Sequence, residues 1–327
     1  MKKIIALLLT AVMTLSVFAG CSTETESTIY KIVTTIYPVY NWLQNLTEGA
    51  ENVELTLLVG DGKDIHNYQP TAEDMVKINE CNYFVYVGGE SDQWVNDAAD
   101  AFFRDNDSKQ KVSLLGLLGS NAKREELVDG MQAEEEEEDN KEDGALDEHV
   151  WLSVRNAEFF CRELASGLKK ADSANASVYE KNEKKYLEKL KALDDKYKKA
   201  LVESDKEYDT LLFGDRFPFR YLVDDYNLKY YAAFAGCSAD SEASFETVAF
   251  LSEKLTELML PVVLTIDSSD GKLARTIIDT SGNSSAQILS LNSMQAVTKD
   301  MIKSETDYIG MMESNLDVLK TALAVKK

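Results

Sequence analysis

Only two histidines occur in this chain of 327 residues, and both lie at the edges of loops. His66 lies in a polar loop, residues 60–70, between a strand-like run and a helix start at Thr71. His149 directly follows an acidic segment. A neutral imidazole suits zinc, manganese or iron, and two imidazoles from distant loops need only one or two carboxylates to complete a four-ligand site. The pair therefore indicates a metal site, although a single histidine is more often a surface or hydrogen-bonded residue.

Short apolar runs predict the elements that must position these histidines. The runs are 32–36, 53–59, 83–87 and 112–117, followed after the middle of the chain by 210–213, 229–234, 262–266 and 287–291. Strands that alternate with helix-compatible stretches are typical of parallel α/β sheets. We therefore predict an α/β protein of two lobes, each a four-stranded parallel sheet with flanking helices. Ligands of such sheets bind beyond the carboxyl ends of the strands, so the ligand should lie between the lobes.

One long segment between the two groups of strands has helical character. Residues 175–203 contain no Gly or Pro, and Tyr and Leu recur there at helical spacing. At 1.5 Å per residue, a helix over 175–203 would be roughly 40 Å long. We predict one long rigid linking helix, bounded at 173–205, that joins a lobe at 31–172 to a lobe at 206–327. A solvated helix within one domain is the alternative.

The N-terminus has the features of an export signal. Lys2 and Lys3 precede an apolar run, residues 4–18, that is shorter than the roughly 20 residues of a spanning helix. We predict a signal peptide at 1–20. The Phe-Ala-Gly-Cys sequence ending at Cys21 resembles the lipobox of bacterial lipoproteins, in which the cysteine is lipidated. Residues 21–30 would then form a lipidated tether, and the protein would be extracytoplasmic on the outer face of the cell membrane.

The charge of the chain excludes one class of partner. A net charge of −22 repels nucleic acid and favours cationic ligands. The acidic loop, predicted over 123–148, carries ten carboxylates against the single Lys141 between Glu134 and Glu148. We expect this segment to be disordered or a mobile loop. Its function would be that of a solvated insertion or of a weak collector of cations beside the site.

At several places the sequence resembles the zinc- and manganese-binding receptors of ABC transporters. The matching stretches are residues 34–38 (Thr-Thr-Ile-Tyr-Pro), 62–71, 86–90, 94–95, 149–152 (His-Val-Trp-Leu), 221–228, 242–244 and 291–295. The resemblance covers essentially the whole mature chain. It implies two four-stranded lobes, a rigid connecting helix and one metal in the cleft. It also implies delivery of the metal to an ABC permease with a cytoplasmic ATPase, and we expect a monomer.

The resemblance also implies ligands. His66 and His149 match the first and second metal-binding histidines of the family. The third ligand position falls on Arg216 by strict counting, and a permanent cation cannot bind a metal, so Asp215 is preferred. The fourth is Asp267, with Asp270 as a nearby substitute. The alternatives are that Asp215 pairs with a neighbouring arginine and that Asp267 caps a helix.

Three cysteines remain if Cys21 is lipidated, and an odd number does not suggest a disulfide framework. Of these, Cys237 follows a strand end and could act as a soft ligand, with a free structural cysteine as the alternative. Two imidazoles and two carboxylates suit manganese or iron, whereas zinc accepts both ligand types and binds more tightly in most nitrogen-containing sites. We favour zinc, with manganese next.

The sequence was also compared with what three other classes of function would require. A zinc hydrolase would need a motif such as His-Glu-x-x-His, which is absent from the sequence, so we do not expect an enzyme. A receptor for a small organic solute could recruit aromatic residues such as Tyr37 and Tyr68. A surface adhesin is the third alternative, and no repeat or recognition motif supports it.

Overall fold

The computed structural model describes residues 29–104, 106, 108–132, 145–238, 242–303 and 307–326. The predicted signal peptide, the lipidation site Cys21 and residues 133–144 of the acidic loop lie outside the described residues.

Two parallel sheets with the same topology form the framework of the molecule. The first sheet consists of β1 (Tyr30–Thr34), β2 (Val53–Leu57), β3 (Tyr83–Tyr86) and β4 (Gln110–Ser113), in the order β2-β1-β3-β4. The second consists of β5 (Thr210–Phe217), β6 (Lys229–Ala235), β7 (Val262–Ile266) and β8 (Gln287–Leu291), in the order β6-β5-β7-β8. All neighbouring strands are parallel. The predicted fold of two four-stranded parallel lobes is confirmed.

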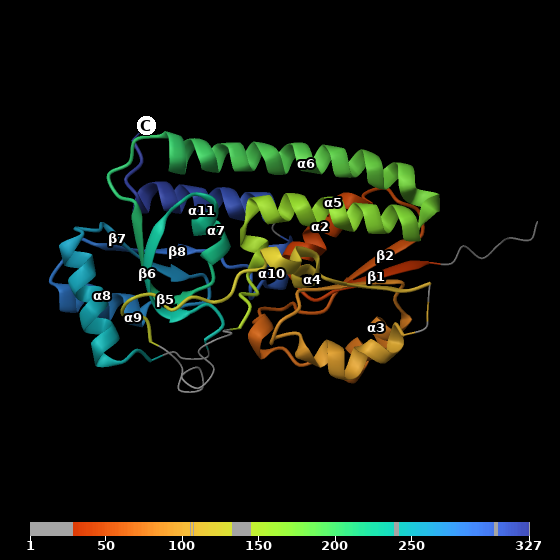
Figure 1. Ribbon diagram of the computed structural model, residues 1–327, viewed down its shortest axis with the longest axis horizontal. Helices are drawn as coiled ribbons and strands as arrows, with labels where there is room; N and C mark the ends of the chain where they lie inside the picture. Colours follow the sequence, from red (N-terminus) through yellow and green to blue (C-terminus); the bar gives the residue numbers. More distant parts are fainter. Residues whose placement is uncertain are drawn as a thin grey trace, which may run out of the picture.

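Helices flank both sheets (Figure 1). In the N-terminal lobe they are α2 (Tyr37–Thr47), α3 (Ala72–Glu80), α4 (Leu114–Leu118) and α5 (Val154–Ala171), with short turns η1 (Ile65–Asn67), η2 (Val95–Ala99), η3 (Asp100–Phe102), η4 (Gly119–Asn121) and η6 (Val150–Leu152). In the C-terminal lobe they are α7 (Arg220–Asp225), α8 (Phe245–Glu257), α9 (Lys272–Ser281), α10 (Lys299–Lys303) and α11 (Tyr308–Ala322). The start of α3 was predicted correctly, because Thr71 and Asp74 form a capping box there.

One predicted strand is partly wrong. The apolar run at 112–117 was expected to be a strand, but β4 ends at Ser113 and α4 occupies Leu114–Leu118. The Ser113 side chain accepts a hydrogen bond from the Gly116 backbone N–H, so it caps the helix at the point where the strand ends. A short apolar run has no periodicity by which a buried strand can be told from a buried helix.

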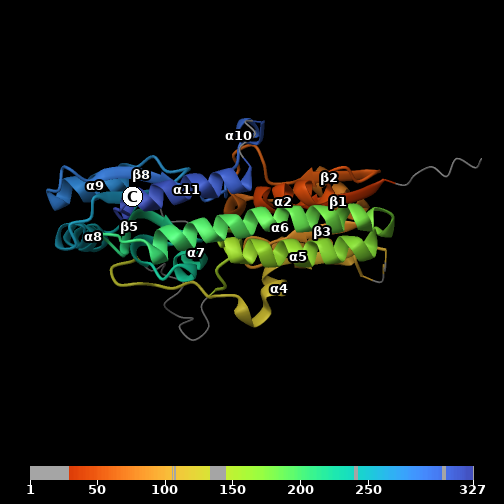
Figure 2. The same cartoon turned by 90° about the horizontal axis from the view of Figure 1, so that it is seen from above.

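The long helix α6 (Ala176–Lys198) is tied to both lobes. It is preceded by η7 (Ser173–Asn175) and continued by η8 (Lys199–Glu203), and it extends along both sheets (Figures 1 and 2). Asn182 Nδ2 donates to the carbonyl of Leu46 in α2 at 3.0 Å. Tyr197 Oη donates to the carbonyl of Met312 in α11 at 2.6 Å. The predicted long helix between the lobes is confirmed, and its hydrogen bonds hold the two lobes to one rigid element.

A continuous apolar core also joins the lobes. Trp151 Nε1, from the first lobe, donates to the carbonyl of Ser293 in the second at 2.9 Å. Tyr308 Oη donates back to the carbonyl of Trp151 at 2.8 Å, and its ring lies edge-on to Trp42 with centroids 5.3 Å apart. Since these aromatic residues are buried, parting the lobes widely would expose apolar surface.

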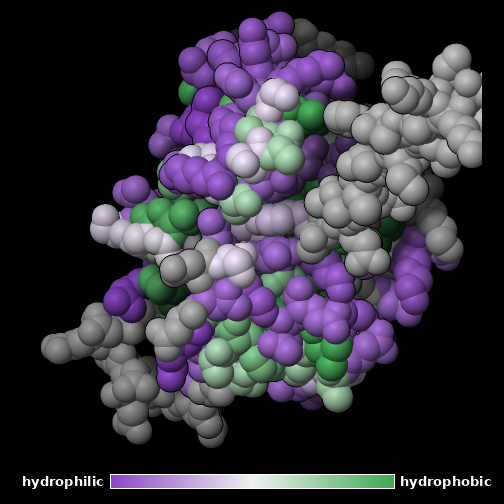
Figure 3. All heavy atoms as spheres, turned by 90° about the vertical axis from the view of Figure 1, so that its right-hand side faces the viewer, coloured by the Kyte–Doolittle hydropathy of each residue, from purple (hydrophilic) through white to green (hydrophobic). Residues whose placement is uncertain are grey.

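The end of the molecule seen in Figure 3, where the N-terminal lobe lies, has a mainly hydrophilic surface. Figure 3 shows this end of the molecule with only small apolar patches between polar side chains. None of the helices in the described part of the chain combines the length and apolar character needed to cross a membrane.

Candidate metal site

His66 is placed by the loop that follows β2. The Asp64 carboxylate accepts the His66 backbone N–H at 3.0 Å and caps the short turn η1. Ile65, on the same turn, is buried and anchors it in the core. His66 Nδ1 lies 2.8 Å from Ser91 Oγ, in the loop after β3. With Nδ1 occupied in this way, Nε2 is the nitrogen that faces the space between the lobes.

His149 is fully buried and is fixed by Asp147. One oxygen of this carboxylate accepts the His149 backbone N–H at 2.8 Å and lies 2.9 Å from Nδ1. A carboxylate that holds Nδ1–H leaves Nε2 with its lone pair free for a metal, which is the usual arrangement behind a metal-binding histidine.

The two Nε2 atoms meet at a separation of 3.1 Å. Two nitrogen ligands of one tetrahedral zinc ion stand roughly 3.3 Å apart, given Zn–N bonds of about 2.0 Å. The histidines are therefore positioned to share one ion, although 83 residues separate them in sequence.

Gln295, from the loop after β8, lies against both imidazoles. Its Nε2 is 2.8 Å from His66 Nε2 and 2.7 Å from His149 Nε2. Its Oε1 is buried and has no hydrogen-bond partner among the described residues. An entering cation must displace this amide, or turn it over so that the oxygen becomes a ligand.

Carboxylates surround the histidine pair. Glu148 Oε1 accepts the Ser91 backbone N–H at 2.8 Å, and its Oε2 lies 3.8 Å from His66 Nδ1. Glu125, Asp147 and His149 offer ligand atoms that all lie within 4.8 Å of one another. Burial raises the pKa of Glu125 and of Glu148. A bound dication would stabilise the charged form of these carboxylates, so the electrostatics of the site favour a cation.

The two histidines differ in their affinity for protons. Burial and the neighbouring His149 lower the pKa of His66 to about 3. Burial also acts to lower the pKa of His149, but the hydrogen bond to Asp147 and the surrounding carboxylates outweigh it and raise that pKa. Of the two imidazoles, His149 is therefore the one that binds a proton more readily.

Cys237 is the side chain of the C-terminal lobe that completes the cluster. Its Sγ and the ring nitrogens of His66 and His149 all lie within 4.8 Å of one another. The residue follows β6, and its backbone N–H donates to Glu125 Oε1 at 2.9 Å. Burial and the nearby carboxylates raise the pKa of the Cys237 thiol. The sequence left this cysteine open as a soft ligand or a structural thiol.

The two predicted aspartate ligands have main-chain partners. Asp215 accepts the backbone N–H of Arg216 at 2.8 Å and that of Ile266 at 3.4 Å. Asp267 accepts the backbone N–H and the hydroxyl of Ser293, both at 2.7 Å. Among the described residues, neither aspartate belongs to the clusters of ligand atoms within 4.8 Å. A carboxylate can accept hydrogen bonds and bind a metal at the same time, so these contacts do not test the assignments, and both stay predictions.

Arg216, which occupies the counted position of the third ligand, binds the opposite lobe. Its guanidinium lies 2.9 Å from Asp64 Oδ2, beside the turn that carries His66. The ion pair links the second lobe to the loop of the first histidine. Asp270, the substitute for Asp267, accepts the backbone N–H of Lys272, the first residue of α9, at 3.0 Å.

Several contributors to the site were not predicted. Asp147 and Glu148 were assigned to a mobile acidic segment, yet both are buried, with 2% and 1% of their surface exposed. Their position immediately before His149 is a signal that could have indicated an orienting role. Gln295 gives no comparable signal, because it reaches the histidines only through the packing of the two lobes.

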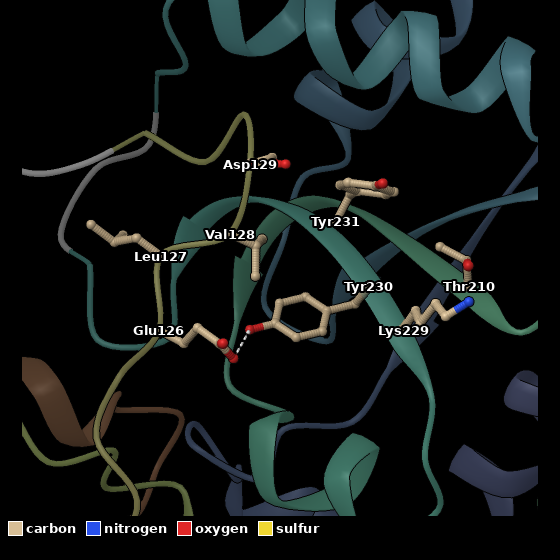
Figure 4. A pocket seen from close by; sticks show the side chains of 8 residues that line it. All are labelled: Glu126, Leu127, Val128, Asp129, Thr210, Lys229, Tyr230 and Tyr231. Carbon is tan, nitrogen blue, oxygen red and sulfur yellow. Dashed lines mark hydrogen bonds between the residues drawn. The ribbon is translucent and has the colours of Figure 1, made fainter.

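A pocket of about 390 Å³ lies away from this site (Figure 4). Residues 126–129 and the first residues of β5 and β6 line it, with Tyr230 Oη 3.4 Å from Glu126 Oε2 across its edge. The metal-site candidates lie instead near the carboxyl ends of the strands. None of the predicted ligands lines this pocket.

Two parallel-sheet lobes held by one long helix, with two histidines meeting between them, define a two-lobe binding protein with a candidate metal site. The chain belongs to the family ZnuA, described as the periplasmic component A of the zinc-uptake complex, which matches residues 32–322.

Similar proteins carry names that refer to zinc. Zinc-binding lipoprotein AdcA of Streptococcus pneumoniae is 31% identical over 324 residues, which cover 98% of this chain and 61% of AdcA. The high-affinity zinc uptake system protein ZnuA of Bacillus subtilis is 29% identical over 308 residues, covering 93% of this chain and 91% of that protein. The Zn(II)-bound ZnuA-like domain of the pneumococcal AdcA has a TM-score of 0.69 at 27% identity, covering 90% and 99% of the two chains. The chain thus spans 61% of the length of the AdcA relative.

Gly236 offers a test of how tightly the site is packed. A Cβ at this position would lie 2.8 Å from His149 Cε1 and 3.0 Å from the carbonyl of Phe217. We expect Gly236→Ala to displace His149 and to lower zinc affinity by about tenfold, the effect of disturbing the support of a metal ligand. Isothermal titration with zinc measures this change.

Gly60→Ala is the matched control. A Cβ there meets only Leu57 Cδ2, at an ordinary 3.8 Å, so zinc affinity should be unchanged. Equal affinities for both variants would show that His149 is not held by the close approach of Gly236.

Proposed function

We propose that the protein captures a divalent transition metal, with zinc favoured over manganese, and delivers it to an ABC permease. The observation that carries this proposal is the 3.1 Å separation of His66 Nε2 and His149 Nε2, each oriented through its Nδ1. Membership of the zinc-uptake family supports transport as the purpose of binding. The family is a transport component, so the proposed role is binding and transfer rather than catalysis.

The proposal extends to location and partners. An export signal at 1–20 and lipidation of Cys21 would hold the protein at the outer face of the cell membrane. The permease would work with a cytoplasmic ATPase, and the receptor would act as a monomer. The lipoprotein name of the pneumococcal relative supports the anchor.

Capture and release would take place through loop shifts and small tilts. The contacts between the lobes near the site include the ion pair of Arg216 with Asp64 and that of Lys299 with Asp61, each at 2.9 Å. Together with α6 and the shared core, they oppose a wide hinge motion. The Gln295 side chain must move aside or turn over when the metal enters, because its amide lies against both imidazoles.

The purified protein, stripped of metal and offered zinc and manganese in equal amounts, tests the proposal directly. After desalting, elemental mass spectrometry should find one equivalent of zinc per chain. One equivalent of manganese would keep the receptor function and reverse the choice of metal. Retention of neither metal would contradict the proposal and favour an organic solute or an adhesive role.

A further inference from the structure

The two histidines supply only two ligands of the candidate metal site, and Cys237 lies where a third ligand is needed. We propose that the Cys237 thiolate is the third protein ligand of the metal and makes the site selective for zinc over manganese. This inference rests on the proposed function and specifies the chemistry of that same site.

Geometry is the first support. Cys237 Sγ and the two histidine nitrogens already lie within 4.8 Å of one another. In a tetrahedral zinc site with bonds of about 2.3 Å to sulfur and 2.0 Å to nitrogen, sulfur and nitrogen ligands stand roughly 3.5 Å apart. Since the present separations are at most 4.8 Å, a shift of at most about 1.3 Å brings the thiolate into position.

Neighbouring residues hold Cys237 close to the two histidines. Its backbone N–H is bound by Glu125 Oε1 at 2.9 Å, and Glu125 belongs to the cluster around His149. Gly236 lacks a side chain at the point where the loop passes closest to the His149 ring. Cys81 and Cys161 are fully buried in apolar cores and belong to neither candidate metal cluster among the described residues.

The C-terminal-lobe side chains at the ligand positions suggested by the sequence make other contacts. Asp215 and Asp267 accept main-chain hydrogen bonds, and Arg216 pairs with Asp64. Cys237 is thus the C-terminal-lobe side chain that already shares a ligand cluster with both histidines among the described residues.

The ligand type then determines the metal. Thiolate and imidazole together favour zinc, whereas manganese prefers carboxylate, carbonyl and water oxygens. Binding would convert the Cys237 thiol to the thiolate, with its proton released to solvent, as in other metal-bound thiols. A cysteine at this position would therefore exclude the harder ion.

The variant Cys237→Ser tests the inference. Cys81→Ser is the matched control, because the new serine hydroxyl can donate the same hydrogen bond to the carbonyl of Ile78 that Cys81 Sγ donates. Cobalt(II) serves as the spectroscopic probe. The parent and Cys81→Ser should show a thiolate-to-cobalt charge-transfer band that Cys237→Ser lacks. Zinc affinity should fall by at least about 100-fold in Cys237→Ser, since loss of even an outer-shell partner costs 10- to 100-fold. The preference for zinc over manganese should fall with it.

Alkylation of the unaltered protein provides a measurement that does not depend on a variant. Zinc should protect Cys237 from iodoacetamide, as read by peptide mass spectrometry. An unchanged zinc affinity and cobalt band in Cys237→Ser, or alkylation that zinc does not slow, would overturn the inference. If the parent still binds one zinc through its histidines in that case, the proposed function stands; if the parent binds no metal, the proposed function itself fails.

Discussion

The double variant His66→Ala/His149→Ala loses zinc binding almost completely, with an expected fall in affinity of at least about 10⁴-fold. Removing one partner that merely orients a metal ligand costs 10- to 100-fold, so removing two direct ligands should cost at least the square of the larger value. His66 and His149 carry the only two imidazoles of this chain, and their Nε2 atoms lie 3.1 Å apart. Competition of the purified proteins against a zinc chelator measures the change.

A folded variant is needed for this result to be informative. His149 is fully buried against Asp147, so its removal leaves a cavity and a buried carboxylate with one partner fewer. His66→Ala alone is the milder variant, because its side chain is 10% exposed. Circular dichroism should show the parent's secondary structure in both.

Thermal unfolding with and without zinc provides an independent measurement of binding. Zinc at 1,000 times its dissociation constant stabilises the folded parent by about 4 kcal/mol, whereas a variant that does not bind zinc gains nothing. Retention of one tightly bound zinc by the double variant would refute the assignment of the histidines.

Zinc affinity should fall on acidification between pH 8 and pH 5, and displacement of the His149 proton alone should account for at least about tenfold of that fall. The pKa of His149 is raised, because the hydrogen bond to Asp147 and the nearby carboxylates outweigh burial. Below that raised pKa, zinc must displace the proton, and the affinity falls about tenfold per pH unit for each proton displaced. The pKa of His66, about 3, keeps that imidazole neutral over the same range.

Acidification has the opposite effect on the folding stability of the protein without bound metal. Because the pKa of His149 is raised in the folded state, the protonated imidazole contributes to folding stability. This contribution is fully present below the pKa of the unfolded state, about 6.5, and is lost as the pH rises through the pKa of the folded state. Acid therefore stabilises this contact while it weakens zinc binding.

Titrations with zinc at several pH values measure the predicted fall. Asp147→Asn is the informative comparison, because without the carboxylate the pKa of His149 should drop and the loss of affinity should move to lower pH. A zinc affinity that stays constant from pH 8 to pH 5 in the parent would rule out displacement of a histidine proton.

The fold was largely readable from the sequence because its signals are local. Alternating apolar runs indicated both sheets, and the absence of Gly and Pro together with Tyr and Leu at helical spacing indicated α6. The prediction failed at Leu114–Leu118, where a cap at Ser113 converts an apolar run into a helix. A run of apolar residues indicates that a segment is buried, and both strands and helices can be buried.

The candidate site was readable only in part. The sequence by itself determined that two rare imidazoles lie at loop edges, and that a signal-like leader and a strongly negative charge accompany them. Tertiary structure decided that the two Nε2 atoms meet, that Asp147 and Glu148 are buried beside them, and that Gln295 and Cys237 join them from the other lobe. The physical reason is separation along the chain: Gln295 lies 229 residues from His66 and Cys237 lies 171 from it, and contacts over such distances depend on the packing of both lobes against α6, which no local pattern encodes.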